Sequence, residues 1–358
     1  MIRTLVVLFG LSLAGLAVAA DRFPLVQDDG GHFTAGPAQP AETLESEFKN
    51  PSAGLAAVLT ALTPGEPRTL GAVTIVPLLQ QNALPPPLAL GAAGPPTAAH
   101  AKDTGAQFQD IGQPSPGIEL ALLGQVLEGP KTQDRLMERS ELIPPGGQSR
   151  VTAFCCEHLF VAQIGEPLDM TAHFVPGSIR MKLVEAYQHD AALMAKLTEL
   201  NRDLGPTQEF TWAEIAERIK AKNVASKYEA FLDQIPYRSA EVKALIAQPL
   251  PPETSGFAIG QGDKLIAIEV FGSPAHLAPH AAELMASWLD VSPDAANLTA
   301  APQAVREAAV ELLKKYPACD AFVGNAGGAV TLVLGGASTT GLALSVRGRP
   351  LHALLVPR

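Results

Sequence analysis

Four polar residues with different hydrogen-bonding abilities stand close together between two apolar stretches of the sequence. They are Lys131, Gln133, Asp134 and Arg135, in the stretch LLGQVLEGPKTQDR, and Glu157 follows the next apolar stretch. A guanidinium group and a carboxamide recognise planar oxygen groups well, so this set could bind an anionic or amide-bearing ligand. The same groups could instead pair with one another and with strand ends, because buried polar groups must find partners. The sequence favours the structural network and leaves the ligand site open.

Other residues with reactive or metal-binding side chains lack the rest of a known pattern. His276 and His280 have the spacing that places two imidazoles on one helix face, but no Glu follows the first His, so the zinc-protease pattern is absent. Pro279 between them indicates a helix start with exposed histidines. The hydroxyl residues 338–340 have no placed base and predict a polar turn, and the glycines of 324–329 predict a hairpin turn. We expect no metal, no cofactor and no complete catalytic set.

The elements around the polar cluster are predicted to be strands. A β-branched stretch, GAVTIVPLL, predicts a strand over 71–79. Three more strands are expected over 118–127, 140–143 and 150–164, and the turn sequence PPGG at 144–147 separates the last two. The polar cluster therefore lies between strands.

Helical periodicity begins after this strand-rich part. Apolar residues recur at three- and four-residue spacing over 179–200, which predicts one long helix. Thr211 and Glu214 have the spacing of a capping box, which predicts that a second helix starts there. A short third helix is expected over 226–234. These helices form a central helical layer.

Strands and helices then alternate in blocks. Two apolar runs over 256–271 are joined by Gly-Gln-Gly-Asp, a hairpin pattern, and helices follow from Pro274 to 289 and from Pro302 to 315. Three strands are expected over 329–358. This order, without regular β-then-α alternation, predicts an α+β fold with a mixed or antiparallel sheet and strand-rich N- and C-terminal parts.

Composition argues for a globular protein that does not bind nucleic acid. The 358 residues are 47% hydrophobic and 17% charged, which excludes global disorder. A net charge of -10, with the basic residues dispersed, gives no surface for gripping phosphates. A small anionic ligand remains a possible partner.

The first residues are typical of a secretory signal. Arg3 precedes an apolar run, and small residues follow up to Ala20, so we expect a cleaved signal over 1–20 and a periplasmic or secreted chain with no membrane span. We divide the rest into an N-terminal extension over 21–70 and one α+β domain over 71–358. That domain carries a Pro/Ala/Gly-rich insertion at 83–105.

The three cysteines are too few for a disulfide scaffold. Cys155 and Cys156 are neighbours whose Cα atoms lie ~3.8 Å apart, below the usual disulfide range. They should not bond each other. Free buried thiols are favoured over a bond from one of them to Cys319.

Several segments in the same order resemble a known family. LLGQVLEGPKTQDR followed by SELIPPGGQSRVTAFCCEH, the helix-rich TQEFTWAEIAERIKAKN, the hairpin SGFAIGQGDKLIAIEVFGSP and the closing GLALSVRGRPLHALLV are similar to the ADP-ribosylglycohydrolase and rhodanese-phosphatase associated protein domain. The resemblance runs from about 71 to the end and lies in collinearity. Thr132 is an extra residue between Lys131 and Gln133, and no Arg soon follows Glu157, where the family often has one. The resemblance implies no activity, because the family has none established, and its name records an association with ADP-ribose metabolism.

Two function classes follow from these observations. The first is an exported binding or structural module with no turnover, favoured because no nucleophile, base and orienting group occur together in a recognisable pattern. The second is an enzyme or receptor for an ADP-ribose-like or other anionic small molecule. That second class would use the weak ligand-binding candidates Lys131, Gln133, Arg135 and Glu157.

Overall fold

The fold is α+β with antiparallel sheets, as the element order predicts. A computed structural model of the chain describes residues 25–27, 33–35, 53–80, 100–102, 108–112, 119–143, 148–161, 163–189, 205–290, 297–315, 318–324, 329–346 and 348–358. The signal over 1–20 and most of the insertion over 83–105 lie outside these residues.

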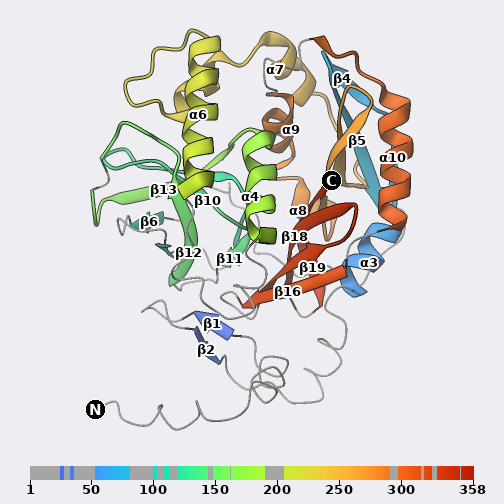
Figure 1. The fold of residues 1–358 in the computed structure, drawn as a ribbon, viewed down its shortest axis with the longest axis horizontal. Coiled ribbons are helices and arrows are strands. Elements are labelled where there is room, and N and C mark those ends of the chain that lie inside the picture. The colour runs from blue at the N-terminus through green and yellow to red at the C-terminus, as the bar shows by residue number, and fades with distance from the viewer. Residues whose placement is uncertain are drawn as a thin grey trace.

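A nine-stranded antiparallel sheet forms one half of the molecule (Figure 1). Its strands, in spatial order, are β16 (Ala318–Gly324), β17 (Ala329–Gly335), β18 (Thr339–Val346), β19 (Arg349–Pro357), β15 (Lys264–Phe271), β14 (Thr254–Gln261), β5 (Val73–Gln80) and β3 (Leu62–Pro64), with β4 (Arg68–Leu70) also on β5. The hairpin β14–β15 turns at Gly262, whose φ of 63° suits glycine. The predicted strands at 71–79 and 256–271 and in the last thirty residues are confirmed.

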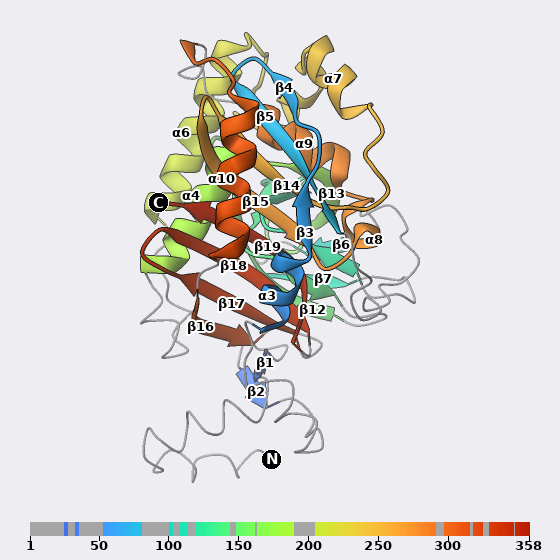
Figure 2. The same cartoon turned by 90° about the vertical axis from the view of Figure 1, so that its right-hand side faces the viewer.

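Both faces of this sheet are buried, because successive side chains of a strand point to opposite faces. On β19, Ala353 and Leu355 belong to one apolar cluster, which we call the outer cluster. Leu354 and Val356 belong to another, the inner cluster. The outer cluster is covered by α3 (Ala53–Thr60) and α10 (Pro302–Lys314), which lie across the sheet in Figure 2. The inner cluster faces the rest of the molecule.

A closed barrel forms the other half. Its strands, in order, are β10 (Arg135–Met137), β12 (Gln148–Cys155), β7 (Phe108–Gly112), β6 (His100–Lys102), β13 (Pro167–Phe174) and β9 (Gln125–Glu128). Two short pairs accompany it: β8 (Glu119–Ala121) with β11 (Glu141–Ile143), and β1 (Leu25–Gln27) with β2 (Phe33–Ala35). A small apolar cluster that includes Leu127, Met137 and Val151 belongs to these barrel strands and the β8–β11 pair.

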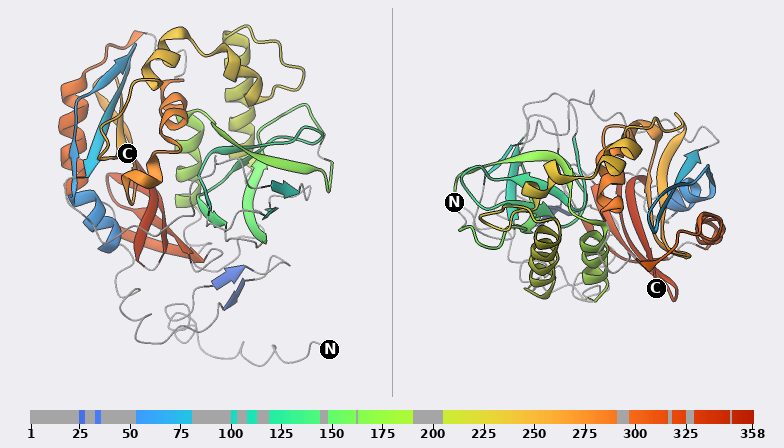
Figure 3. Two further views of the ribbon diagram at one scale, coloured as in Figure 1. Left: turned by 180° about the vertical axis from the view of Figure 1, so that it is seen from behind. Right: turned by 90° about the horizontal axis from the view of Figure 1, so that it is seen from above.

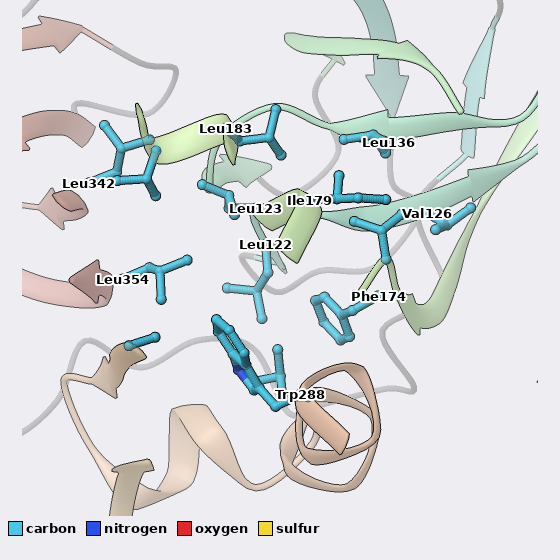
Figure 4. Close-up of a cluster of buried hydrophobic side chains, with 14 of the residues drawn as sticks. Leu122, Leu123, Val126, Leu136, Phe174, Ile179, Leu183, Trp288, Leu342 and Leu354 are labelled. Carbon is cyan, nitrogen blue, oxygen red and sulfur yellow. The ribbon is translucent and has the colours of Figure 1, made fainter. Parts of the chain in front are cut away.

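Helices lie between the barrel and the sheet, which confirms the central helical layer (Figure 3). They are α4 (Gly177–His189), α8 (Pro274–Leu277) and α9 (Ala281–Leu289), flanked by α6 (Gly205–Ala221), the 3-10 helix η2 (Phe231–Tyr237) and α7 (Ala240–Ile246). One apolar cluster joins them to both halves; it includes Leu122, Phe174, Ile179, Trp288 and Leu354 (Figure 4). The two halves therefore share a core.

Three helix predictions were wrong in detail. The predicted capping box is absent, because α6 already begins at Gly205 and Thr211 lies inside it, where its hydroxyl donates to the Thr207 carbonyl. The helix expected over 226–234 is the 3-10 helix η2. The helix expected from Pro274 to 289 is split into α8 and α9 by residues 278–280. Of the long helix predicted over 179–200, α4 covers the start, and residues 190–204 lie outside the described part.

Candidate functional site

The predicted polar cluster lies where β9 turns into β10, and most of it faces inward. The Gln133 amide donates to the backbone carbonyl of Glu157, and the Asp134 backbone N–H donates to Glu157 Oε2 at 3.0 Å. Asp134 Oδ1 accepts from the Gly129 N–H at 2.9 Å, which closes the turn. All three of these side chains are therefore engaged with the chain itself.

Arg135 and Lys131 have opposite environments. Arg135 is buried on β10, and its Nη1 contacts the Cys155 thiol at 2.9 Å across the β10–β12 pair. The Lys131 side chain is 72% exposed and lies 3.9 Å from Glu166. The structure thus brings Gln133, Asp134 and Glu157 together and leaves Lys131 in solvent.

The carboxyl groups of this cluster resist ionisation. Burial, partly opposed by the Gly129 hydrogen bond and helped by the nearby charges of Glu157, Glu128 and Asp233, raises the pKa of Asp134 to about 7. Burial also raises the pKa of Glu157. Burial makes negative charge unfavourable here, so an anionic ligand would lose hydration on entering.

A second polar cluster, which the sequence reasoning missed, lies between the sheet and the barrel. Its centre is Glu269 on β15, a fully buried carboxylate. The Arg180 guanidinium on α4 pairs with both oxygens, with Nη1 at 2.9 Å from Oε2 and Nη2 donating to Oε1. Trp288 Nε1 donates to Oε2 at 2.8 Å, and His352 Nε2 lies 2.9 Å from Oε1. Each carboxylate oxygen therefore accepts two hydrogen bonds.

The hydrogen bonds continue from His352 to the barrel side. An ionised carboxylate only accepts, so His352 Nε2 carries the proton and Nδ1 accepts. Ser140 Oγ, 2.8 Å from Nδ1, is then the donor, and it accepts from the Leu123 N–H at 3.0 Å. Burial lowers the pKa of His352, against the pull of Glu269, so the imidazole is neutral. We call Ser140, Arg180, Glu269, Trp288 and His352 the interface network.

Charge in the interface network is balanced. Burial alone would raise the pKa of the Glu269 carboxyl, but Arg180, with help from His352, holds that pKa well below its usual range. The guanidinium of Arg180 also lies over the rings of Phe174 and Trp288, at 5.5 and 5.2 Å from their centroids. Glu269 and Arg180 form an ion pair in a dry, aromatic setting.

Local geometry makes room for this arrangement. Gly124, with φ of 79°, occupies a conformation that favours glycine, and a Cβ there would lie 2.6 Å from Arg180 Cγ. Arg180 Nε donates to the neighbouring Leu123 carbonyl. On the sheet, Glu269 and His352 lie on adjacent strands and on the face toward the barrel, because they alternate with residues of the outer cluster.

His276 and His280 are buried, contrary to the expected exposure. His276 lies in α8, which contacts β14 and β15 of the sheet. His280 precedes α9 and lies beside the Phe174 and Phe271 rings. Burial, with the nearby His352, lowers the pKa of His280 to about 4. Among the described residues, no group of three potential ligands could hold a metal ion.

The thiols follow the prediction, whereas the predicted polar turn at residues 338–340 was largely wrong. Cys155 and Cys156 are both free, and burial raises the pKa of Cys156 well above its usual value. Ser338 lies in the turn between β17 and β18, but Thr339 and Thr340 are the first residues of β18 and are buried. No described helix is long and apolar enough to cross a membrane.

Comparison with known families decides the relationship. The model of the ARPP-1 domain, described as the ARG and Rhodanese-Phosphatase-superfamily-associated Protein domain, matches residues 61–356. The chain belongs to the ARPP-1 family. This match confirms the resemblance seen in the sequence, and the ARPP-1 family is of uncharacterised function. No curated protein and no solved structure matches the chain.

The sequence did carry a signal for the interface network of this ARPP-1 domain. Glu269 interrupts the apolar run LIAIEVF, and His352 interrupts LHALLV. A charged residue inside a strand that is apolar on both sides needs a buried partner. Arg180 stands within the apolar stripe of its helix, and together these three exceptions could have indicated the network.

Proposed function

We propose that this ARPP-1 protein is an exported module that works by binding and has no turnover of its own. In this proposal the polar cluster at 131–135 has a structural role in the barrel and does not bind a ligand. The observation that carries the proposal is the inward direction of Gln133, Asp134 and Arg135, whose side chains contact other parts of their own chain. The proposed export is supported by the signal pattern over residues 1–20.

The alternative, an enzyme or receptor for an ADP-ribose-like or other anionic molecule, has weaker support. Its candidate residues Gln133 and Arg135 are buried, and the burial that raises the pKa of Asp134 and Glu157 also disfavours a bound anion. Lys131 remains exposed, but a single exposed cation contributes little.

The interface network has the residue types of a nucleophile, a base and an orienting acid, so it needs a separate argument. Ser140 donates to His352, and His352 donates to Glu269. Ser140 is only 6% exposed, and Arg180 already neutralises Glu269, which leaves less negative charge to stabilise a protonated imidazole. These facts favour a structural role for the network.

The test uses the chain purified after export from an expression host. Melting temperatures of the parent, Arg135→Ala and Lys131→Ala are measured with and without nucleotides, ADP-ribose, sugars, carboxylates and metals. We expect Arg135→Ala to lose about 1–3 kcal/mol, because it leaves buried groups unpaired, and the exposed Lys131→Ala to change stability by less than about 0.5 kcal/mol. N-terminal sequencing should start at Asp21.

Three outcomes would overturn the proposal. One is release of a product from ADP-ribose or from a simple ester. Another is covalent labelling of Ser140 by a fluorophosphonate probe. The third is an ADP-ribose-induced rise in melting temperature that Arg135→Ala abolishes while the variant stays as stable as the parent.

A further inference from the structure

A pocket of about 330 Å³ opens beside the helical layer, away from both polar clusters. Its walls come from the end of α7, from the segment leading into β14, and from α8 and α9. In Figure 1, α7, α9 and α8 follow one another from the top of the molecule downwards. The volume is at the lower end of the range for small-molecule sites, ~300–1,000 Å³.

Small side chains create this hollow. Ala278 and Ala282 stand at the exposed side of α8 and α9, and Ala281 lies deeper. Larger apolar side chains surround them, among them Leu277 and Met285. The helices thus present an apolar floor.

The facing wall is held in place. Pro249, Pro251 and Pro252 fix the backbone of the segment, and none of them has an N–H to donate. Arg68 holds this wall through hydrogen bonds to the carbonyls of Gln248 and Pro249, at 3.0 and 2.6 Å. The pocket is therefore formed in advance, which lowers the ordering cost of binding.

The chemistry of the lining specifies the ligand. None of the described residues that line the pocket is charged. The Thr254 hydroxyl donates to the Pro251 carbonyl, so its proton is already engaged. A charged group entering here would lose hydration and meet no opposite charge among these residues, because Gln248 provides the other polar side chain. An uncharged, mainly apolar group would gain from burial in proportion to the area covered.

We propose that this pocket is a binding site for the apolar part of a small uncharged molecule, such as an aliphatic chain or an aromatic ring. The proposal rests on the binding function proposed above and names its ligand class. It replaces the anionic ligand class with a neutral one and moves the site from the barrel to the α7–α9 side of the sheet.

Two fluorescent probes with a shared ring skeleton test the proposal on the full chain. N-phenyl-1-naphthylamine is neutral, and 1-anilinonaphthalene-8-sulfonate is its anionic counterpart. We expect saturable fluorescence enhancement with the neutral probe and at least about tenfold weaker binding of the anion, a difference of 1.4 kcal/mol or more.

Variants locate the binding. Ala278→Leu and Ala282→Leu place a larger side chain at the exposed side of the pocket and should each weaken binding of the neutral probe about tenfold or more. Ala275→Leu is the matched control, because Ala275 is exposed on α8 and does not line the pocket. It should bind like the parent. Melting curves check that all three variants stay folded.

Each result supports or overturns the site. Absence of saturable binding, equal or tighter binding of the anion, or unchanged affinity in both filled variants would overturn it. If a ligand from the thermal-shift panel still binds Ala278→Leu and Ala282→Leu, the proposed binding function is supported but this pocket is not its site. Turnover would overturn the proposed function and leave a positive probe result intact.

Discussion

The buried pair of Glu269 and Arg180 shows how a single charged residue constrains its surroundings. Removing two ions from water costs several kcal/mol each, and their attraction offsets this only with good geometry and satisfied remaining groups. Here both carboxylate oxygens are doubly hydrogen bonded, and His352 and Trp288 supply the donors that Arg180 does not. Loss of one member should therefore cost more than the net contribution of the pair.

Arg180→Met is expected to destabilise the protein by about 3–5 kcal/mol, because it leaves the Glu269 charge buried without its cation. Adding Glu269→Leu to it removes that charge, so the double variant should be more stable than Arg180→Met alone. Urea denaturation gives the free energies of unfolding. Lys314→Ala, which removes a pair between side chains 64% and 59% exposed, is the control. A double variant that is less stable than Arg180→Met would contradict this account.

Asp134 makes stability depend on pH in the opposite direction to an ordinary surface carboxylate. Its pKa is about 7 in the fold, against an ordinary value of 3.8 for an aspartate side chain. A raised carboxyl pKa means that the folded state binds more protons, so stability is lost as pH rises from about 4 to 7 and stays low above that. The whole effect is up to roughly 4 kcal/mol.

Asp134→Asn keeps the oxygen that accepts from Gly129 and removes the titration. We expect the variant to be more stable than the parent at about pH 8, and this advantage to shrink steadily toward about pH 4. Urea denaturation across this range measures it. A pH-independent difference between the two proteins would show that the carboxyl does not titrate in this way.

Sequence reasoning at this scale identified polar residues but not their partners. Gln133, Asp134 and Glu157 do meet, as the structural interpretation expects. The interface network was missed because Ser140, Glu269 and His352 are far apart in the chain and meet only through the packing of barrel on sheet. Local pattern contains no information about that packing.

At the scale of elements, α10 rests on the sheet through a close approach. A Cβ on Gly260 of β14 would lie 2.2 Å from Val305 Cγ2 on α10. The absence of a side chain at residue 260 therefore sets the distance between the helix and the sheet. Val305 fills the space that results, and it is fully buried.

Gly260→Ala should destabilise the protein by about 1–3 kcal/mol through overpacking. Val305→Ala should also destabilise it, because it leaves a cavity. Combined, the methyl group added at residue 260 occupies part of the space left by the two methyl groups removed at residue 305, so the loss should be smaller than the sum of the separate losses. A thermodynamic cycle from urea denaturation measures this coupling. Strict additivity would mean that the two residues do not contact each other as described.

The elements themselves were predicted best where periodicity is long or a turn is distinctive. The β14–β15 hairpin, α10 and the closing strands match their predictions. The capping box at Thr211 failed because Thr, Trp, Ala and Glu occur as readily inside a helix as at its start. The turn between α8 and α9 falls at Pro279, which indicated a helix start in the sequence but was not used to divide the helix predicted from Pro274 to 289.

At the scale of the whole molecule, barrel and sheet are joined by one apolar cluster and one polar network. The cluster includes Val126 from the barrel and Leu342 from the sheet, with α4 and α9 between them. Neither half can separate without exposing this shared surface and the Glu269 charge. The molecule should therefore unfold as one unit.

The two tryptophans report on different places and allow this to be measured. Trp212 stacks on His158 beside the barrel, and Trp288 lies in the interface network. In Trp212→Phe and in Trp288→Phe, the remaining tryptophan fluorescence should follow the same urea transition as the far-ultraviolet circular dichroism of that variant. Transitions that separate within either variant would indicate two independently unfolding parts.

The α+β class was predictable from the order of elements, but the closed barrel was not. Several of its strands, such as β6 and β10, are only three residues long. The strands are also separated in the sequence: β6 precedes residues 103–107, β7 follows them, and the other four strands come after residues 113–118. Short strands carry little periodicity, and closure depends on pairings between distant segments, such as β6 with β13.

The position of β19 in the sheet also determines when the fold can be completed. β19 is the last described strand in the chain, yet it lies between β18 and β15, so the group β16–β18 and the group β15–β14–β5 meet only through it. During synthesis from the N-terminus, neither group can join the other until residues 349–357 have left the ribosome. The same strand brings His352, so the hydrogen bonds of Glu269 are also incomplete until then. A sheet that stays incomplete until β19 has been made suits the passage of an unfolded chain through a membrane channel, which the proposed export would involve.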